Sequence, residues 1–282
     1  MKNIFLVPNT KKDKDYSVTR AVAQKLISLD FSIFMLDLYK GSGVESCSYV
    51  GNIPESAELV LVIGGDGSFI DAAGFAIKND IPILGINLGK VGYLSEIEPT
   101  DLSPLEKLNT GEYSIDKKML LAVSSERDGG KLENKLAVND VVLSHPSYLG
   151  IADFVLISAE GGVRYRADGI VVSTPAGSTA YSLSAGGPIV SHGANAIIVT
   201  PIAPHSFFNR SIVFGENEEI KIKNISSDAL NLSLDGRFYH VLAPGEKCTV
   251  RASEKNLKVL TFKENNMFSN LFSKMQIMED II

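Results

Sequence analysis

The residues of this chain best suited to chemistry form a glycine-rich turn. Gly64-Gly65-Asp66-Gly67 follows an apolar run, Leu59 to Ile63, that is typical of a buried strand. Ser68 is then expected to cap an amphipathic helix. Glycines let the backbone approach a ligand closely, and free N–H groups at a helix start attract an anion such as phosphate. Beside a phosphate, Asp66 could accept a proton from an attacking hydroxyl or help to hold Mg²⁺. The alternative is a tight turn with an ordinary aspartate.

A second polar group stands in apolar sequence. Asn139 and Asp140 come at the end of a predicted apolar strand, where two polar side chains are unusual. An amide and a carboxylate side by side can donate to and accept from a purine edge and ribose hydroxyls. A turn or bulge is the structural alternative.

Two further segments carry charge. In Arg164 to Ile170, a two-residue period puts Arg164, Arg166 and Asp168 on one face of a strand. The cations suit phosphate and the carboxylate suits an amide or hydroxyl, whereas a solvated charged face is the alternative. Leu234 to Arg237 is an Asp-Gly turn that carries a cation.

The longest polar motif is STPAGSTAYSLS, residues 173–184, which continues as AGGP. Pro175 and Gly177 predict a turn, after which a short helix is expected from Ser178 to Ala185. Small side chains around Tyr181 would admit a flat ring, on which the tyrosine can stack. A plain capped helix is the alternative.

Strands and helices alternate in the first half of the chain, which predicts a parallel sheet with helices on its faces. Ligands of such sheets bind beyond the carboxyl ends of the strands, where Asp66 and Asn87-Leu88-Gly89 both fall. The expected strands are Ile4 to Val7, Phe31 to Leu36, Leu59 to Ile63 and Ile81 to Ile86, and the expected helices are Ser17 to Leu29 and the one that begins at Ser68.

From about residue 111 the pattern changes to short strands and tight turns, which is typical of an all-β sandwich. Asp128-Gly129-Gly130 predicts a hairpin, and the amphipathic residues Met267 to Ile282 predict a helix that packs back on the first half. The expected strands are Met119 to Ser124, Leu136 to Leu143, Phe154 to Ala159, Ile170 to Ser173, Ala196 to Thr200, Glu219 to Lys223, Leu230 to Leu234 and Cys248 to Ala252.

Composition limits the classes of partner that the protein is expected to bind and the cellular compartment in which it is expected. The net charge of −6 argues against a broad surface for nucleic acid or anionic membranes. Cys47 and Cys248 are far apart and lack metal-ligand spacing, which favours a reducing cytoplasm over a disulfide scaffold. The first apolar stretch ends at Pro8, too early for a signal peptide, and no apolar run approaches the roughly 18 residues that span a membrane. We therefore expect a cytoplasmic protein that binds neither nucleic acid nor membrane.

Taken together and in this order, GGDG, the Asn–acid pair, the Arg-x-Asp-Gly strand and STPAGSTAYSLSAGGP resemble the NAD kinase family over nearly the whole chain. The resemblance implies an α/β Rossmann-like N-terminal domain with the GGDG loop (1–110), a β-sandwich dinucleotide-binding domain (111–262) and a C-terminal segment that returns to the first domain (263–282). It implies transfer of the ATP γ-phosphoryl group to the 2′-hydroxyl of the adenosine ribose of NAD, giving NADP. Mg²⁺ or another divalent cation would accompany ATP.

The resemblance also implies a role for each matching residue. Asp66 is the implied proton acceptor and, with Gly67, contacts the dinucleotide. Asn139 and Asp140 match the family's asparagine–acid pair, in which glutamate is commoner at the second position. The family often carries glutamine or histidine where Arg237 stands. The further implied binding residues are Arg166, Asp168, Thr179, Ala180, Tyr181, Ser182, Leu183, Ser184 and Arg237.

Other expectations concern charge and assembly. Lys90 or Arg210 could neutralise charge on the ATP phosphates. No histidine has metal-ligand spacing, so no side-chain metal site is expected, and His205, in a Pro-rich loop, is the one with a possible further role. The family resemblance implies a homo-oligomer, often a tetramer.

Two other functions share parts of this pattern. GGDG also occurs in kinases of diacylglycerol and sphingoid lipids, although the acidic composition does not favour a membrane-facing surface. A non-catalytic dinucleotide sensor could keep the binding residues, but an intact Asp66 speaks against it. The sequence leaves open whether polyphosphate replaces ATP, whether NADH is accepted and whether NADP(H) inhibits.

Overall fold

The computed structural model describes residues 1–262 except 90, 91, 93, 128, 129, 132–134, 148 and 149. The described chain divides into two compact units, one of residues 1–117 with 257–262 and one of residues 118–256. The predicted C-terminal helix, 267–282, and Lys90 lie outside the described residues. None of the described helices is both long and apolar enough to cross a lipid bilayer.

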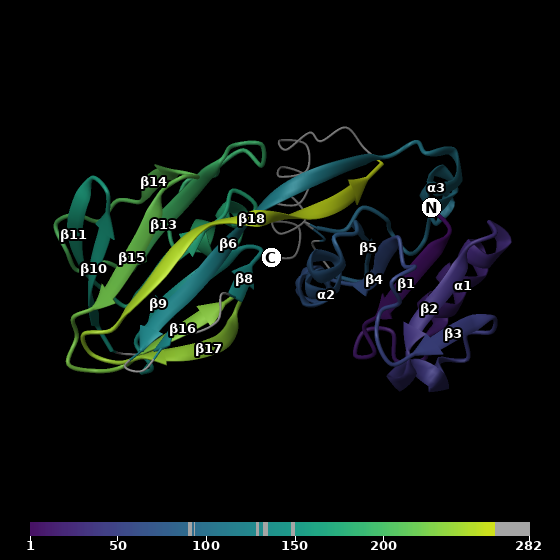
Figure 1. Cartoon of the computed structure of the whole chain (residues 1–282), viewed down its shortest axis with the longest axis horizontal. Helices are drawn as coiled ribbons and strands as arrows, with labels where there is room; N and C mark the ends of the chain where they lie inside the picture. Colours follow the sequence, from purple (N-terminus) through teal and green to yellow (C-terminus); the bar gives the residue numbers. More distant parts are fainter. Residues whose placement is uncertain (90–91, 93, 128–129, 132–134, 148–149, 263–282) are drawn as a thin grey trace, which may run out of the picture. The chain divides into compact units, whose positions relative to one another are not determined.

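The first unit is built on a parallel sheet with the strand order β3-β2-β1-β4-β5, and the end of β18 adds to β5 (Figure 1). Helix α1 packs on β2 and α2 packs on β4. The elements are β1 (Asn3–Pro8), α1 (Ser17–Ser28), β2 (Ser32–Leu36), a 3₁₀ helix (Asp37–Ser42), β3 (Cys47–Val50), β4 (Leu59–Gly64), α2 (Asp66–Asn79), β5 (Ile83–Asn87), a second 3₁₀ helix (Ser103–Glu106) and α3 (Lys107–Thr110).

The order of these strands creates a switch point between β1 and β4. The chain winds from β1 outward through β2 and β3, then returns to place β4 on the other side of β1. Connections that leave neighbouring strands in opposite directions open a crevice at the carboxyl ends of those strands. In this chain the switch point lies where β1 ends at Pro8 and β4 ends at Gly64.

The second unit packs two antiparallel sheets face to face. One has the order β11-β10-β15-β18-β6, with β7 and β8 also on β6, and the other β14-β13-β12-β9-β16-β17. The strands are β6 (Ser114–Arg127), β7 (Gly130–Lys131), β8 (Lys135–Ala137), β9 (Asp140–Ser144), β10 (Ala152–Ser158), β11 (Gly161–Ala167), β12 (Gly169–Ser173), β13 (Ala196–Ile202), β14 (Ile212–Gly215), β15 (Glu219–Asn224), β16 (Leu230–Leu234), β17 (Arg237–Leu242) and β18 (Lys247–Thr261), and the helical turns are Gly177–Thr179 and α4 (Tyr181–Ser184).

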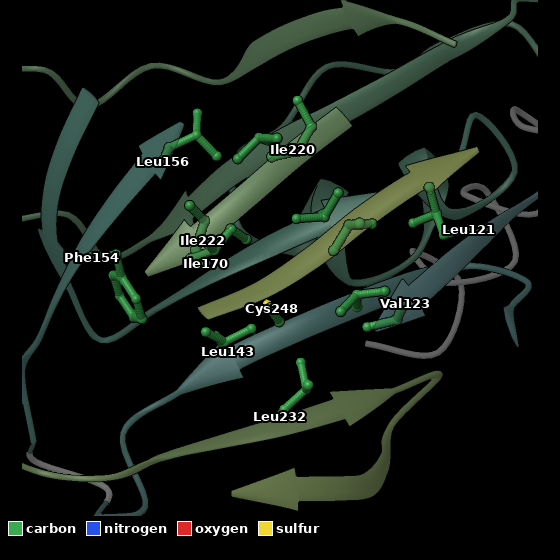
Figure 2. Close-up of a cluster of buried hydrophobic side chains, with 14 of the residues drawn as sticks. Leu121, Val123, Leu143, Phe154, Leu156, Ile170, Ile220, Ile222, Leu232 and Cys248 are labelled. Atoms are coloured by element: carbon green, nitrogen blue, oxygen red, sulfur yellow. The ribbon is translucent and has the colours of Figure 1, made fainter. Parts of the chain in front are cut away.

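Alternating side chains of both sheets fill the core between them. Figure 2 shows Phe154 and Ile222 from one sheet and Leu143 and Leu232 from the other pointing into one apolar cluster. The thiol of Cys248 lies in this cluster, and burial raises its pKa to about 12. The two sheets form a sandwich, so the predicted architecture of an α/β unit followed by an all-β sandwich is confirmed.

Three local predictions are wrong. Ser68 does not cap α2, because the helix already begins at Asp66 and Gly65 takes the cap position. The strand expected over 136–143 is two strands, since Val138 and Asn139 leave the ladder between β8 and β9. The helix expected over 178–185 is a 3₁₀ turn followed by the four-residue α4, because the chain leaves helical geometry at Ala180.

Other differences concern strand ends. The strand with Arg164 and Arg166 is β11, but it stops at Ala167, so Asp168 lies beyond it. The sequence pattern missed β3, β7, β14 and β17, which are short or interrupted by polar residues. At the expected hairpin, β6 and β7 pair up to Arg127 and Gly130, and the two residues between them lie outside the described part.

Candidate active site

The glycine turn stands at the switch point of the parallel sheet. Gly64 ends β4, and Asp66 opens α2. A Cβ on Gly64 would lie 2.5 Å from the Cβ and Oγ of Ser68, so only glycine permits this strand to turn directly into the helix. The resulting helix start directs backbone N–H groups toward the carboxyl edge of the sheet, where an anion can bind.

Asp66 is half-buried in the first turn of α2. Its Oδ1 accepts the backbone N–H of Leu94 at 2.9 Å. This bond ties the carboxylate to the chain that follows β5. The side chain is therefore held in place by both sides of the turn, as a proton acceptor in catalysis must be.

A second glycine turn lies against the first. The buried Asn87 ends β5, its Oδ1 accepts the N–H of Gly89 at 2.8 Å, and its Nδ2 donates to Glu98 at 3.1 Å. A Cβ on Gly65 would lie 3.5 Å from the Cα of Gly89, so the two turns are in contact. Asn87 thus fixes the second turn beside the GGDG turn.

Lys12 is the residue of this region that the sequence pattern missed. Its Nζ lies 2.7 Å from the point where a Cβ on Gly65 would stand, and 3.4 Å from the equivalent point on Gly89. Asn9 holds the loop that carries Lys12. Its Oδ1 accepts the Lys12 N–H at 3.1 Å, and its Nδ2 donates to the Ser68 hydroxyl at 2.5 Å. The sequence does contain a signal for this position, because Lys12 comes soon after the first strand, whose end lies at the switch point.

In the second unit, a single carboxylate organises the Asn139–Asp140 pair. Asp235, in the turn between β16 and β17, accepts the N–H groups of Val138, Asn139 and Asp140 at 2.9, 2.7 and 3.1 Å. The backbone of Asp235 has φ of 49°, a left-handed conformation that Asn and Asp tolerate best among residues with a side chain. The Asp-Gly turn therefore supports the break between β8 and β9.

The STPAG segment holds the same break from its carbonyl side. Thr174 donates its N–H to the carbonyl of Asn139 at 2.9 Å and its hydroxyl to the carbonyl of Val138 at 2.8 Å. A Cβ on Gly177 would stand only 2.0 Å from the Asn139 carbonyl oxygen, so glycine is required there. The motif singled out in the sequence is thus partly a clamp for the asparagine–acid pair.

Burial and neighbouring charge act on the acidic side chain of the pair. Asp140 is 5% exposed. Its burial, and second the charge of Asp235, raise the pKa of Asp140 to about 7. Burial also raises the pKa of Asp235, while its three backbone N–H bonds oppose that rise. Burial thus acts on both carboxyl groups, but only Asp235 accepts backbone N–H bonds that favour its ionised form.

The residues from Thr179 to Ser184 divide into structural and accessible positions. Ser182 is buried and its hydroxyl shares a hydrogen bond of 3.1 Å with that of Thr200. Thr179, Ala180 and Leu183 are half-buried, and Ser184 is exposed. Tyr181 opens α4 with 44% of its surface exposed, which leaves its ring free to stack on a flat ligand.

Arg166 and Asp168 lie away from Asn139 within this unit. On the β9–β12 pair, Asp140 stands opposite Ser173, whereas Gly169, next to Asp168, stands opposite Ser144 at the other end. The four residue steps between Gly169 and Ser173 correspond to about 13 Å. The backbone of Arg166 is bonded instead to the loop after β13, and the backbone of Asp168 to Ile202 at the end of β13 and to His145.

That loop contains His205. The backbone N–H of His205 donates to the carbonyl of Arg166 at 2.7 Å, and its Nε2 lies 3.8 Å from Asp168 Oδ1. Arg210 is exposed, and its carbonyl accepts the hydroxyl of Tyr165 at 3.3 Å. Arg237 is exposed at the start of β17, two residues after Asp235.

Comparison with known protein families identifies both halves of the chain. Residues 4–113 match the ATP-NAD kinase N-terminal domain, and residues 138–262 match the ATP-NAD kinase C-terminal domain. The chain is 33% identical to the NAD kinase of Natranaerobius thermophilus over 98% of each chain. It is 36% identical to that of Geotalea daltonii over 82% of this chain and 84% of the relative.

Solved structures share the fold. Yeast NADH kinase, solved with NADH, superposes with a TM-score of 0.86 at 21% identity, over 98% of this chain and 88% of the yeast chain. An NAD kinase from Archaeoglobus fulgidus, solved with ATP, gives a TM-score of 0.75 at 23% identity, over 98% of this chain and 99% of that one.

Proposed function

This chain belongs to the NAD kinase family, and on that basis we propose that it transfers the γ-phosphoryl group of ATP to the 2′-hydroxyl of the adenosine ribose of NAD, giving NADP. The observation that carries the proposal is the GGDG turn with Asp66 at the switch point of the parallel sheet. Phosphoryl transfer needs positioned phosphates, charge neutralisation and an oriented hydroxyl more than covalent help from the protein.

The donor side of the reaction uses the two glycine turns. Their N–H groups and the ammonium of Lys12 bind the ATP phosphates, since the glycines leave the backbone open to close approach. Asp66 accepts the proton of the attacking 2′-hydroxyl. Its bond to the Leu94 N–H orients the carboxylate for that transfer.

A divalent cation arrives with ATP in this proposal. Mg²⁺ is usually held by substrate phosphates and water together with one or two carboxylates. Asp66 is the carboxylate at the turn that could contact it. When bound, the ion neutralises charge on the phosphates.

The acceptor side uses the second unit. Asn139 and Asp140 bind the adenosine of NAD, and Tyr181 stacks on a flat ring of the dinucleotide. Gly67, together with Asp66, contacts the dinucleotide. The remaining acceptor-binding positions are Arg166, Asp168, Thr179, Ala180, Ser182, Leu183, Ser184 and Arg237; for the buried Ser182, the contribution is to hold α4 in place.

Assembly and compartment complete the proposal. The protein functions as a homo-oligomer, a tetramer on family grounds, in the cytoplasm, where it supplies the NADP pool. Light scattering of the purified protein measures the mass of the assembly. A monomer that is fully active would overturn this part.

The deciding experiment is a turnover assay of the purified full chain. ATP, Mg²⁺ and NAD are supplied, and NADP is detected by a dehydrogenase that reduces only NADP. Parallel reactions replace ATP with polyphosphate, NAD with NADH, and NAD with diacylglycerol or sphingosine. NADP formation that is lost in Asp66→Asn, and kept in the Asp71→Asn control on the same helix, supports the proposal.

Two other results would contradict it. Phosphorylation of a lipid would indicate a GGDG lipid kinase, and NAD binding without turnover would indicate a sensor. The named relatives favour neither of these alternatives.

A further inference from the structure

We infer that Asp140 binds the acceptor nucleotide as a neutral carboxylic acid that donates a hydrogen bond, with Asp235 as the positioning residue that holds it and carries the negative charge. The inference rests on the proposed function, because it concerns the NAD-binding residues of an NAD kinase. An ionised aspartate only accepts hydrogen bonds, whereas a protonated one donates as well. The protonation state therefore decides which atoms of the ligand Asp140 can recognise.

The fold treats the two carboxyl groups differently. Asp235 accepts three backbone N–H groups from residues 138–140, and such bonds stabilise the ionised form. The side chain of Asp140 is buried, and in the described part of the chain it has neither an N–H donor nor a cation as partner. When two carboxyl groups share one site, the better solvated group carries the charge.

The two strands that pair with β9 offer Asp140 no compensating charge. The flanking strands β12 and β16 have the sequences GIVVS and LNLSL, without an ionisable side chain. Opposite Asp140 on β12 stands Ser173, whose buried hydroxyl is neutral and has no hydrogen-bond partner among the described residues. Basic groups stand on β17, which pairs with β16 and carries His240 and the exposed Arg237, and on β8, which carries the exposed Lys135.

The backbone around the pair is fixed from both sides. Asp235 binds the N–H groups, and Thr174 binds the carbonyl groups of Val138 and Asn139. Neither residue needs to touch the nucleotide to do this, so Asp235 acts through the pair. The backbone that carries Asn139 and Asp140 is therefore preorganised before the ligand arrives.

A neutral carboxyl group offers one O–H donor beside one carbonyl acceptor. This combination matches a purine edge, where a ring nitrogen accepts and a neighbouring amino group donates. An ionised carboxylate would bind two ribose hydroxyls equally well, so hydroxyls alone would not require the proton. We therefore assign the proton of Asp140 to an acceptor atom of the ligand, such as a purine ring nitrogen.

Calorimetric titration with NAD in the absence of ATP tests the inference on the full chain. Titrations at pH values from 6.5 to 8.5, each in two buffers of different ionisation enthalpy, report proton uptake on binding. Above pH 7 the wild type is expected to take up a proton with NAD, and its affinity should fall by up to about tenfold per pH unit. This follows because the ionised Asp140 must regain its proton in order to donate.

Three variants separate this role from a structural one. Asp140→Asn is neutral at every pH, so its affinity should stay within about threefold of the wild-type value at pH 6.5, without the proton uptake. Asp235→Asn removes the neighbouring charge and suits the left-handed backbone. Without that charge the pKa of Asp140 is lower, so the loss of NAD affinity with rising pH should begin at a lower pH than in the wild type. Asp228→Asn, an exposed carboxylate of the same unit, should match the wild type.

The outcomes are distinct. The inference is wrong if wild type and Asp140→Asn show the same proton uptake. It is also wrong if Asp140→Asn binds NAD more than about tenfold more weakly at pH 6.5 with an unchanged circular dichroism spectrum, since the carboxylate itself would then be needed. Failure of the wild type to bind NAD would overturn the proposed function and the inference together.

Discussion

The ammonium group of Lys12 lies 2.7 Å from the point where a Cβ on Gly65 would stand. The lysine follows the first strand of the parallel sheet, and the glycine follows the fourth. Because β1 and β4 are neighbours at the switch point, residues 53 positions apart (65 − 12) share one edge of the sheet. A cation is thus held directly over the glycine turn.

Lys12→Met is expected to weaken ATP binding selectively. It keeps the aliphatic stem and removes a charged donor, whose hydrogen bonds contribute about 1.5–3 kcal/mol, or roughly 10- to 100-fold in KM for ATP. KM for NAD should change far less. Steady-state kinetics with each substrate varied separately would show the difference, and Lys11→Met, its exposed neighbour, is the matched control. Equal losses for both substrates would argue against phosphate binding.

Asp66→Asn is expected to lower kcat by about 10²-fold or more, the scale of general base catalysis. The amide can still accept the Leu94 N–H, so the turn should keep its shape. Thermal melting should therefore be close to that of wild type. Asp71→Asn, on the exposed side of the same helix, controls for removal of a carboxylate from α2. A kcat near the wild-type value would remove Asp66 from the chemistry.

Tyr181→Ala is expected to weaken NAD binding by roughly 1 kcal/mol, the contribution of an aromatic pair beyond its buried area. The ring is 44% exposed, so its loss should leave the melting temperature nearly unchanged. ATP affinity should also stay the same. A large drop in stability, measured by circular dichroism, would instead identify a structural tyrosine.

Asn139→Ala is expected to raise KM for NAD by about tenfold or more, because a group built to pair with the ligand leaves its partner unsatisfied when it is removed, at about 1–3 kcal/mol. The backbone bonds to Asp235 and Thr174 do not depend on this side chain. Asn231→Ala on β16 is the control for a half-buried asparagine of the same unit. An unchanged KM would make the side chain structural.

The two-part architecture could be predicted because local patterns decide it. The apolar run before GGDG is a strand of the parallel sheet, and the strictly alternating residues from Glu219 are β15 of the sandwich. Such periodicities are carried by neighbouring residues and need no tertiary information. The GGDG turn was placed correctly for the same reason, since strand, glycines and helix are consecutive.

What could not be predicted depends on contacts between distant segments. The break at Asn139 is stabilised by Asp235, 96 positions away, and Lys12 reaches Gly65 only through the strand order of the sheet. The helix start was misplaced because Ser68 is a good capping residue by type, but Asn9 engages its hydroxyl instead. Sequence spacing does not reveal such partners.

The raised pKa of Asp140 also predicts how stability depends on pH. In the unfolded chain its carboxyl group titrates near 3.8, and in the folded protein near 7. Between these values the unfolded state releases the proton and the folded state keeps it, so the contribution of Asp140 to the free energy of unfolding falls as pH rises through this window. It is constant above about pH 7, where the loss is at most about 4 kcal/mol.

The variant Asp140→Asn lacks this titration. Its free energy of unfolding in urea, minus that of wild type, should therefore increase from pH 5 to pH 7 and then level off, while Glu160→Gln, a change at an exposed carboxylate of the same unit, shows no such trend. A difference that is the same at pH 5 and pH 8 would mean that Asp140 is ionised in the folded protein throughout this range.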